Sequence, residues 1–382
     1  MILHRPSRLF QTIGQLRSAD WLLLLAVFTL LLLGLSAIYS VELSQEASTF
    51  LHMKKQVVAA LVGVAIFLSL ALSNYKLLQN YSLALYCLCT GLLVLVLIVG
   101  ETIRGSTGWF VLGGVSFQPV EIMKVSLVIT LSTYFARRAV RPLSVRSLWQ
   151  SGLMTLLPVG LVLLQPDFGS ASVLLGTWFI FLLFVGMPWR AIVSMVLLMA
   201  VLFGASWLFL FADYQRSRIL TFFDPSVDPL GQGYNVAQAI IAIGSGGWLG
   251  SGLGFGTQSQ LKFLPESQTD FIFAVIAEEL GFLGVMLVLV SFAFVFYRLI
   301  RHAAHAHDDF TSYLVLGCGT IFFLQFFVNI GMNLGVFPVT GIGLPWVSYG
   351  GSSLMVMLAL VGIVESIAMR RPGGQVGRDM VS

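Results

Sequence analysis

Charged side chains that fall inside long apolar stretches are the residues of this sequence best placed to do chemistry. Glu121 and Lys124 lie in one such stretch, and Glu278 and Glu279 lie in another. A charged group at the centre of a membrane-spanning helix costs roughly 2.5–3.5 kcal/mol, so each must be paired or face a hydrated cavity. Glu121 and Lys124 are three residues apart on one helix face, which permits a local ion pair. Such a pair serves either a site or the orientation of helices.

Asp270 stands at the start of the apolar stretch that contains Glu278 and Glu279. A carboxylate at this position can act as a general base. Thr269 and Asp270 before an apolar run are equally typical of a helix N-cap. On a continuous helix Glu278 would lie roughly 12 Å further along the axis, near the same face. The spacing alone leaves both roles of Asp270 open.

Three polar segments lie between apolar stretches and indicate a site on one side of the chain. The longest runs from Asp213 to Gln268 and contains Arg216, Arg218 and Lys262. The segment 101–118 carries Trp109, which suits either a cover over a sugar ring or an anchor at the membrane interface. The segment 335–346 is rich in glycine and proline, and irregular backbone at membrane depth is tolerated where it lines a polar cavity.

The elements that position these residues are membrane-spanning helices. Hydrophobic residues make up 57% of the chain and charged residues only 10%, which leaves too little polar surface for a soluble protein of this length. About 20 apolar residues in a helix cross about 30 Å of hydrocarbon. The sequence therefore predicts an all-α integral membrane protein with about ten spans, near 20–41, 55–73, 79–99, 119–136, 148–165, 169–187, 190–212, 270–297, 311–334 and 345–369.

The basic residues predict which side is cytoplasmic. Most of the 21 lysines and arginines fall in the segments that are inside if the N-terminus is inside. We therefore expect a cytoplasmic segment 1–19, a membrane domain 20–369 with a large outer loop 213–268 between spans seven and eight, and a cytoplasmic tail 370–382. His302, His305 and His307 then lie on a solvated inner loop. The net charge of +4 follows from this topology and indicates no nucleic-acid partner.

The ordered polar motifs resemble those of the SEDS family (shape, elongation, division and sporulation) over about residues 15–370. The segment 338–341, Pro-Val-Thr-Gly, is more similar to the elongation branch than to the division branch. The matching residues are Phe117-Gln118-Pro119 with Glu121 and Lys124, Gln165-Pro166-Asp167-Phe168-Gly169, Asp213-Tyr214-Gln215-Arg216 with Arg218, Asp228-Pro229-Leu230-Gly231, Gly256-Thr257-Gln258-Ser259-Gln260, Phe263-Leu264-Pro265-Glu266, Thr269-Asp270-Phe271-Ile272-Phe273-Ala274, Glu278-Glu279-Leu280-Gly281, Val328-Asn329-Ile330-Gly331-Met332, Leu344-Pro345 and Ser348-Tyr349-Gly350-Gly351-Ser352.

The resemblance implies an inverting peptidoglycan glycosyltransferase for cell elongation and rod shape, in the bacterial cytoplasmic (inner) membrane. Its substrate would be lipid II, the undecaprenyl-pyrophosphate disaccharide, polymerised on the outer face. The implied partners are a class B penicillin-binding transpeptidase and other membrane proteins of the elongation complex, within the lipid bilayer.

The same resemblance assigns roles to the polar residues. It nominates Asp270 as the catalytic base that accepts the proton of the acceptor hydroxyl. Substrate-binding candidates are Arg216, Arg218, Lys262, Trp109, Glu121 and Lys124, with the three loop cations set against the charge of the departing pyrophosphate. A divalent ion such as Mg or Mn is compatible with this chemistry, with Asp167 or Glu266 as candidate ligands, but no spacing demonstrates a metal site, and no cofactor is assigned.

The sequence departs from the family at positions where relatives often carry a cation. Gly108 and Ser116 replace common arginines, and Ser267-Gln268 replaces a His-rich approach to Asp270. Two other functions remain open. A flippase or transporter of lipid-linked precursors would use the intramembrane charges along a hydrated path. A noncatalytic scaffold for cell-wall synthases would not need Asp270.

Overall fold

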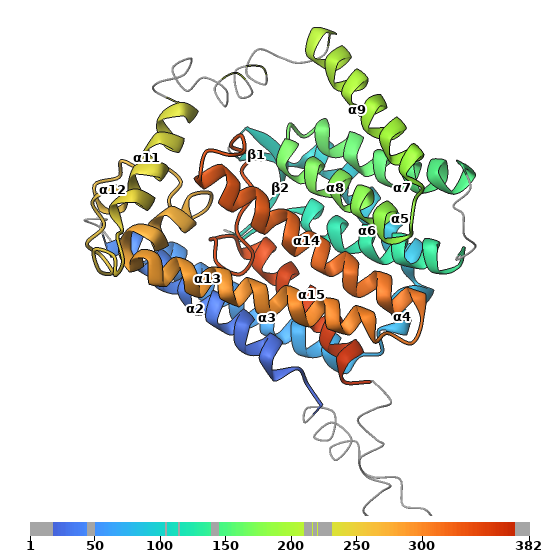
Figure 1. Cartoon of the computed structure of the whole chain (residues 1–382), viewed down its shortest axis with the longest axis horizontal. Coiled ribbons are helices and arrows are strands. Elements are labelled where there is room, and N and C mark those ends of the chain that lie inside the picture. Colours follow the sequence, from blue (N-terminus) through green and yellow to red (C-terminus); the bar gives the residue numbers. More distant parts are fainter. Residues whose placement is uncertain are drawn as a thin grey trace, which may run out of the picture.

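The computed structural model describes residues 18–43, 50–103, 105–113, 115–138, 145–209, 216, 220 and 231–370 (Figure 1). Residues 1–17 of the predicted N-terminal segment, the tail beyond Arg370 and residues 213–215, 217–219 and 221–230 of the 213–268 loop, Arg218 included, lie outside these residues. The helices are α2 (Trp21–Leu43), α3 (Leu51–Leu72), α4 (Lys76–Asn80), α5 (Ser82–Val99), α6 (Pro119–Ala136), α7 (Val145–Leu163), α8 (Phe168–Phe184), α9 (Trp189–Phe209), α11 (Gln232–Ser245), α12 (Thr257–Gln260), α13 (Ile272–Ala304), α14 (Asp309–Asn333) and α15 (Gly351–Ala368).

Each of the ten predicted spans coincides with one helix of the described chain. Seven of these helices, α2, α3, α5, α6, α13, α14 and α15, are long and apolar enough to cross a membrane. The other three predicted spans correspond to α7, α8 and α9. The protein is therefore a helical membrane protein, and ten spans stays a prediction. The sequence placed the last span from residue 345, whereas α15 begins at Gly351 because residues 345–349 form a turn.

Helices α6 and α15 occupy the centre of the bundle. In the apolar window of each, 83% of the residues are buried, against 28–50% in the other five membrane-length helices. Helix α15 packs along α3, α13 packs along α2, and α6 lies among α5, α8 and α14. The polar residues that α6 carries are thus in the protein interior and not against lipid.

Helix α13 is broken at Gly281, where the backbone adopts φ 63° and ψ −158°. Glycine alone adopts this region readily. The loop 246–252 inserts at the break, and the amides of Phe282 and Leu283 donate to the carbonyls of Gly247 and Trp248 at 2.9 and 3.2 Å. The predicted span 270–297 is therefore two helical pieces that end at Ala304. We call the end of the bundle where α11, α12 and this break lie the loop end (Figure 1, left).

A small antiparallel sheet replaces the irregular loop expected between α5 and α6. It consists of β1 (Glu101–Ile103), β2 (Ser106–Leu112) and β3 (Val115–Phe117), in the order β1-β2-β3. Trp109 of β2 pairs with Glu101 of β1. The strands are short and glycine-interrupted, so they leave only a weak alternating pattern in the sequence.

The opposite end of the bundle is held by a buried charge cluster, and we call it the terminal end. The Asp20 carboxylate accepts from Arg298 Nε and pairs with His302 Nε2, both at 2.6 Å, and the Asp20 amide donates to Glu365 at 3.0 Å. The prediction that His302 lies on a solvated loop is wrong, because α13 continues past it and its side chain is buried.

Candidate functional site

Asp270 lies at the loop end, in the turn that precedes α13. The helix begins at Ile272, its N-cap is Phe271, and no side chain caps it. The N-cap interpretation of Asp270 is therefore wrong. The Asp270 amide donates to the Glu266 carbonyl at 3.1 Å, so the residue belongs to the turn 266–271. The residue is partly buried.

Two asparagines of α14 fix the backbone around Asp270. Asn329 Nδ2 and Asn333 Nδ2 donate to the Asp270 carbonyl at 3.0 and 2.9 Å. Asn333 Oδ1 also accepts from the Ala274 amide at 3.2 Å, in the first turn of α13. Both asparagines are buried, so these bonds are protected from water. The start of α13 is thereby fastened to the end of α14.

The segment before α15 holds the same turn from another side. Ser348 Oγ donates to the Thr269 carbonyl at 2.6 Å, and the Tyr349 amide donates to the Gln268 carbonyl at 2.8 Å. A Cβ on Gly341 would lie 4.0 Å from Asp270 Oδ2, which places this segment beside the carboxylate. Three consecutive residues, 268–270, are thus held by hydrogen bonds to two separate elements.

Glu121 and Lys124 form the predicted ion pair. Lys124 Nζ lies 2.8 Å from Glu121 Oε1, and the two side chains are 4% and 8% exposed. The second oxygen of Glu121 is buried with no hydrogen-bond partner among the described residues. A buried carboxylate oxygen left without a donor costs stability, and such groups often serve function.

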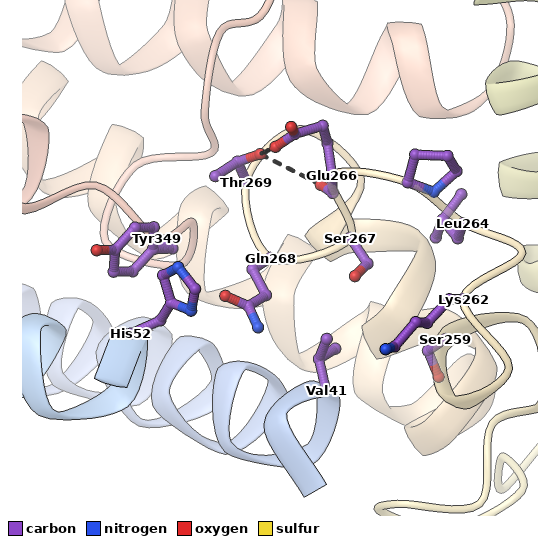
Figure 2. Close-up of a pocket in the computed structure, with 11 residues that line it drawn as sticks. Val41, His52, Ser259, Lys262, Leu264, Glu266, Ser267, Gln268, Thr269 and Tyr349 are labelled. Carbon is purple, nitrogen blue, oxygen red and sulfur yellow. Dashed lines mark hydrogen bonds between the residues drawn. The ribbon is translucent and has the colours of Figure 1, made fainter. Parts of the chain in front are cut away.

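Of the two loop cations that the structure describes, Lys262 is the one beside the Asp270 turn. It lines a pocket of about 310 Å³ together with Glu266, Gln268 and Thr269 (Figure 2). Figure 2 shows its ammonium directed into this pocket. Arg216 instead donates to the Leu208 carbonyl at the end of α9. The structure therefore places Lys262 at this pocket and Arg216 near the end of α9, not together.

The sheet 101–117 covers the junction of α7 and α8, where the sequence departs from its family. A Cβ on Gly108 would lie 2.9 Å from Gln165 Oε1, and the Thr107 amide and Ser106 hydroxyl donate to the Gln165 carbonyl. The space that a longer residue would need at 108 is thus taken by Gln165. Trp109, the next residue of β2, is half-buried.

The carboxylates considered as metal ligands have other contacts. Asp167 caps α8 by accepting from the Ser170 amide at 2.9 Å, and it also accepts from Gln118 Nε2 at 3.1 Å. Glu266 accepts from the Thr269 hydroxyl at 3.0 Å. Within the described part of the chain, no three His, Cys, Asp or Glu side chains gather as metal ligands would. We assign no metal site.

Glu278 and Glu279 hold the loop that precedes the site. Glu278 accepts from the amides of Gln258 and Ser259 at 2.7 and 3.1 Å. Glu279 accepts from Ser40 Oγ at 2.7 Å and Ser259 Oγ at 3.2 Å. Sequence reasoning marked both as polar residues within a span but missed this anchoring, because their partners come from a loop whose fold has no periodic signal.

The sequence matches the FtsW/RodA/SpoVE family, described as a cell cycle protein family, over residues 20–372. Peptidoglycan glycosyltransferase MrdB of Escherichia coli K12 is 41% identical over 320 residues, which are 84% of this chain and 86% of that protein. Stage V sporulation protein E of Bacillus subtilis 168 is 37% identical over 361 residues, which are 92% of this chain and 97% of that one.

Solved structures show the same fold. RodA of Thermus thermophilus superposes with a TM-score of 0.70 at 30% identity, covering 93% of this chain and 98% of its own. A chain of a peptidoglycan synthase complex, studied for the coordination of polymerization and crosslinking, superposes with a TM-score of 0.78 at 36% identity and the same coverage.

Proposed function

This chain belongs to the FtsW/RodA/SpoVE family and is a peptidoglycan glycosyltransferase, and we propose that it polymerises lipid II for cell elongation with Asp270 as the catalytic base. The proposal is carried by one observation: the turn 268–270 is held by α14 and by the segment before α15, which fixes Asp270 beside the pocket that contains Lys262.

The chemistry requires little more than one base and some positive charge. The bond formed joins the acceptor hydroxyl oxygen to the anomeric carbon of the donor, and the bond broken joins that carbon to pyrophosphate. A single displacement inverts the anomeric carbon, and pyrophosphate leaves without a protonated acid. Asp270 accepts the hydroxyl proton in this displacement. Lys262, with Arg216 and Arg218, stabilises the charge on the departing pyrophosphate.

Glu121, Lys124 and Trp109 complete the proposed substrate-binding residues. The buried Glu121–Lys124 pair places one charge of each sign in the central helix α6, where a hydrated headgroup would meet them. Trp109 presents a half-buried ring on β2, suited to a sugar face. We propose that these three side chains contact lipid II.

The proposed setting follows from the same family membership. The reaction takes place at the loop end, on the outer face of the inner membrane, with both termini in the cytoplasm. The likeness to a chain of a peptidoglycan synthase complex supports a crosslinking partner, which we propose is a class B penicillin-binding transpeptidase in the elongation complex. The lipid bilayer covers the exposed apolar faces of the helices.

A transporter of lipid-linked precursors is not favoured by any contact in the described chain. Of the four intramembrane charges that a hydrated path would use, Glu278 and Glu279 accept hydrogen bonds from loop amides and hydroxyls. The other two, Glu121 and Lys124, pair with each other. A scaffold without activity would not explain why two buried asparagines donate hydrogen bonds to the Asp270 carbonyl.

The test is glycan synthesis from lipid II by the purified protein, with and without the transpeptidase, followed by sizing of the products. Asp270→Asn keeps the size of the side chain and the carbonyl that binds α14, so we expect polymer to fall at least about a hundredfold, the scale of general-base catalysis. The thermal midpoint should stay near that of the wild type. Asp309→Asn, at an exposed residue of the terminal end, is the matched control. Normal polymer from Asp270→Asn would place the base elsewhere.

A further inference from the structure

The pocket beside Asp270 extends beyond Lys262 to a second end formed by His52 and Tyr349. His52 is near the start of α3 and Tyr349 is in the segment before α15, and their rings meet edge to face with centroids 4.9 Å apart. Figure 2 shows Gln268 reaching into the space between His52 and Lys262. This second end, which we call the His52 end, is formed by groups that the proposed chemistry does not use.

A buried carboxylate sets the orientation of His52. Glu42, whose side chain is 2% exposed, lies 3.1 Å from His52 Nδ1 and accepts from the backbone amides of His52 and Met53 at 2.8 and 3.1 Å. A ring nitrogen engaged with a carboxylate fixes the imidazole and leaves the other nitrogen for a further partner. Because the His52 side chain is 43% exposed and lines the pocket, a ligand can reach it.

The charges around the His52 end select against an anionic ligand there. The Glu42 carboxylate directly behind the ring places a negative charge at this end. Glu266 lines the same pocket and opposes the charge of Lys262. Among the residues that line the pocket, Lys262 is the one lysine or arginine, so the His52 end suits a ligand that is polar but uncharged.

The polar groups at the His52 end match an amino sugar. The Gln268 amide both donates and accepts, as sugar hydroxyls and acetamido groups require. The rings of His52 and Tyr349 provide apolar surface for the carbon-bound hydrogens of a sugar. The volume of about 310 Å³ is at the small end of ligand pockets, enough for one sugar unit and not for a peptide-bearing disaccharide.

The location ties this pocket to the reacting centre. Gln268 and Thr269 line it, and Asp270 is the next residue, about 3.8 Å further along the Cα trace. Tyr349 and Gln268 both line the pocket, and the Tyr349 amide donates to the Gln268 carbonyl. This hydrogen bond attaches the Tyr349 segment to the turn 266–271. A sugar in the pocket therefore lies against the turn that carries Asp270.

We propose that the His52 end of this pocket is a saccharide subsite, which binds one N-acetylated hexosamine unit of the glycan through His52 and Gln268. The proposal rests on the glycosyltransferase function above and adds a binding position outside the reacting pair. The sugar comes either from the growing strand or from the incoming lipid-linked precursor.

Binding is tested directly with a soluble N-acetylglucosamine tetramer, which carries neither lipid nor phosphate. We expect saturation-transfer NMR to show binding to the purified wild type, and Gln268→Ala to weaken it about threefold to tenfold, the loss of one or two hydrogen bonds. The substitution keeps the carbonyl that Tyr349 uses. His52→Gln retains a polar group and should weaken binding less than His52→Ala. Lys55→Ala, at an exposed residue of the same helix, should bind like the wild type.

Polymerisation assays identify the source of the sugar. If the subsite holds the growing strand, Gln268→Ala yields shorter glycans at an unchanged KM for lipid II. If it holds the precursor, the KM rises instead. Inhibition by inorganic pyrophosphate should be the same in Gln268→Ala and wild type, because that anion binds near Lys262.

Two results would overturn the subsite. One is tetramer binding that is equal in wild type, Gln268→Ala and His52→Ala. The other is a change in pyrophosphate inhibition with no change in tetramer binding, which would make the His52 end an anion site. Because the NMR measurement does not depend on turnover, a failure of the proposed polymerase activity is recognised separately, by absence of glycan from the wild type.

Discussion

Asn333 shows how one side chain gives a catalytic candidate a fixed position outside a helix. Its Nδ2 donates to the Asp270 carbonyl, and its Oδ1 accepts from the Ala274 backbone amide. It therefore links the turn before α13 to the first turn of that helix. An aspartate in its place could not donate, and a leucine could do neither. The precision of the Asp270 position therefore depends on an uncharged amide in the neighbouring helix.

The Glu121–Lys124 pair gives a prediction at the scale of single residues. Removing one partner leaves the other unpaired in the interior, which costs about 3–5 kcal/mol, whereas exchanging the two charges retains the pair. Glu121→Ala and Lys124→Ala should each lose glycan synthesis and lower the thermal midpoint. The exchanged variant, Glu121→Lys with Lys124→Glu, should recover part of both, measured at equal membrane abundance.

The controls for this pair are Glu101→Ala and Lys55→Ala, which remove exposed charges and should have little effect. Full activity in both single variants would remove any role for the pair. If the exchanged variant regained stability but not activity, each charge would have its own contact with the substrate.

At this scale the sequence predicted what depends on local spacing. The i,i+3 spacing of Glu121 and Lys124 was sufficient for their ion pair, and it is observed. The choice between base and cap for Asp270 was not decided, because both roles use the same residue type before an apolar run. The asparagines that hold the Asp270 backbone come from α14, about sixty residues away. The role as base stays a proposal.

Among the elements, the short helix α12 depends on α13 for its position. Glu278 of α13 accepts hydrogen bonds from two backbone amides at the start of α12. Its negative charge also interacts favourably with the partial positive charge of these unpaired helix N–H groups. Glu279 binds α12 and α2 together through Ser259 and Ser40. Charges that looked like a path through the membrane instead fasten a loop to the bundle.

The break at Gly281 gives a prediction at the scale of elements. A Cβ at this position would lie 2.3 Å from Gly250 N and 2.8 Å from the Leu249 backbone, and the φ of +63° is itself strained for alanine. Gly281→Ala should therefore displace the loop 246–252. We expect faster hydrogen exchange at the amides of Phe282 and Leu283, which the loop protects, and a loss of glycan synthesis.

Gly244→Ala is the matched control, because it lies in α11 with open space around its Cβ position. It should leave exchange at Phe282 and Leu283 unchanged. Unchanged exchange in Gly281→Ala as well would mean that the loop does not depend on the break.

The long helices were predictable from the sequence, whereas the break in α13 and the small sheet between α5 and α6 were not. Apart from Glu278 and Glu279, the residues on both sides of Gly281 are predominantly apolar, so the sequence predicted α13 as one span. The break depends on Leu249 and Gly250, which approach only in the folded chain. The strands of the 101–117 sheet are three to seven residues long, too short for an alternating pattern to distinguish them from a loop.

In the whole molecule, the two ends of the bundle use their polar groups differently. At the loop end, asparagines and serines position the turn of Asp270 with uncharged hydrogen bonds. At the terminal end, charged side chains join the segment before α2 to α13 and α15. Hydropathy predicted the spans in sequence order but not this arrangement, because Asp20 and Glu365 are separated by 345 residues.

The Asp20 cluster gives a prediction for the whole fold. Asp20→Ala removes the carboxylate that pairs with Arg298 and His302 of α13. These two basic side chains then lose that carboxylate near the start of α2. We expect a loss of about 3 kcal/mol, at the low end for a broken buried pair, because the Arg298 side chain retains 22% exposure. The thermal midpoint in detergent should fall by several degrees. Asp309→Asn, at an exposed residue of the same end, should change it little.

The same variant separates stability from catalysis. Asp20 lies at the end of the bundle away from the Asp270 turn, so Asp20→Ala should lower the amount of folded protein while the protein that remains folded polymerises lipid II at a nearly normal rate. Asp270→Asn should show the reverse, with normal folding and little polymer. If Asp20→Ala lowered the rate per folded molecule as strongly as Asp270→Asn, the two ends would be coupled through α13, and the break at Gly281 would be the first place to look for that coupling.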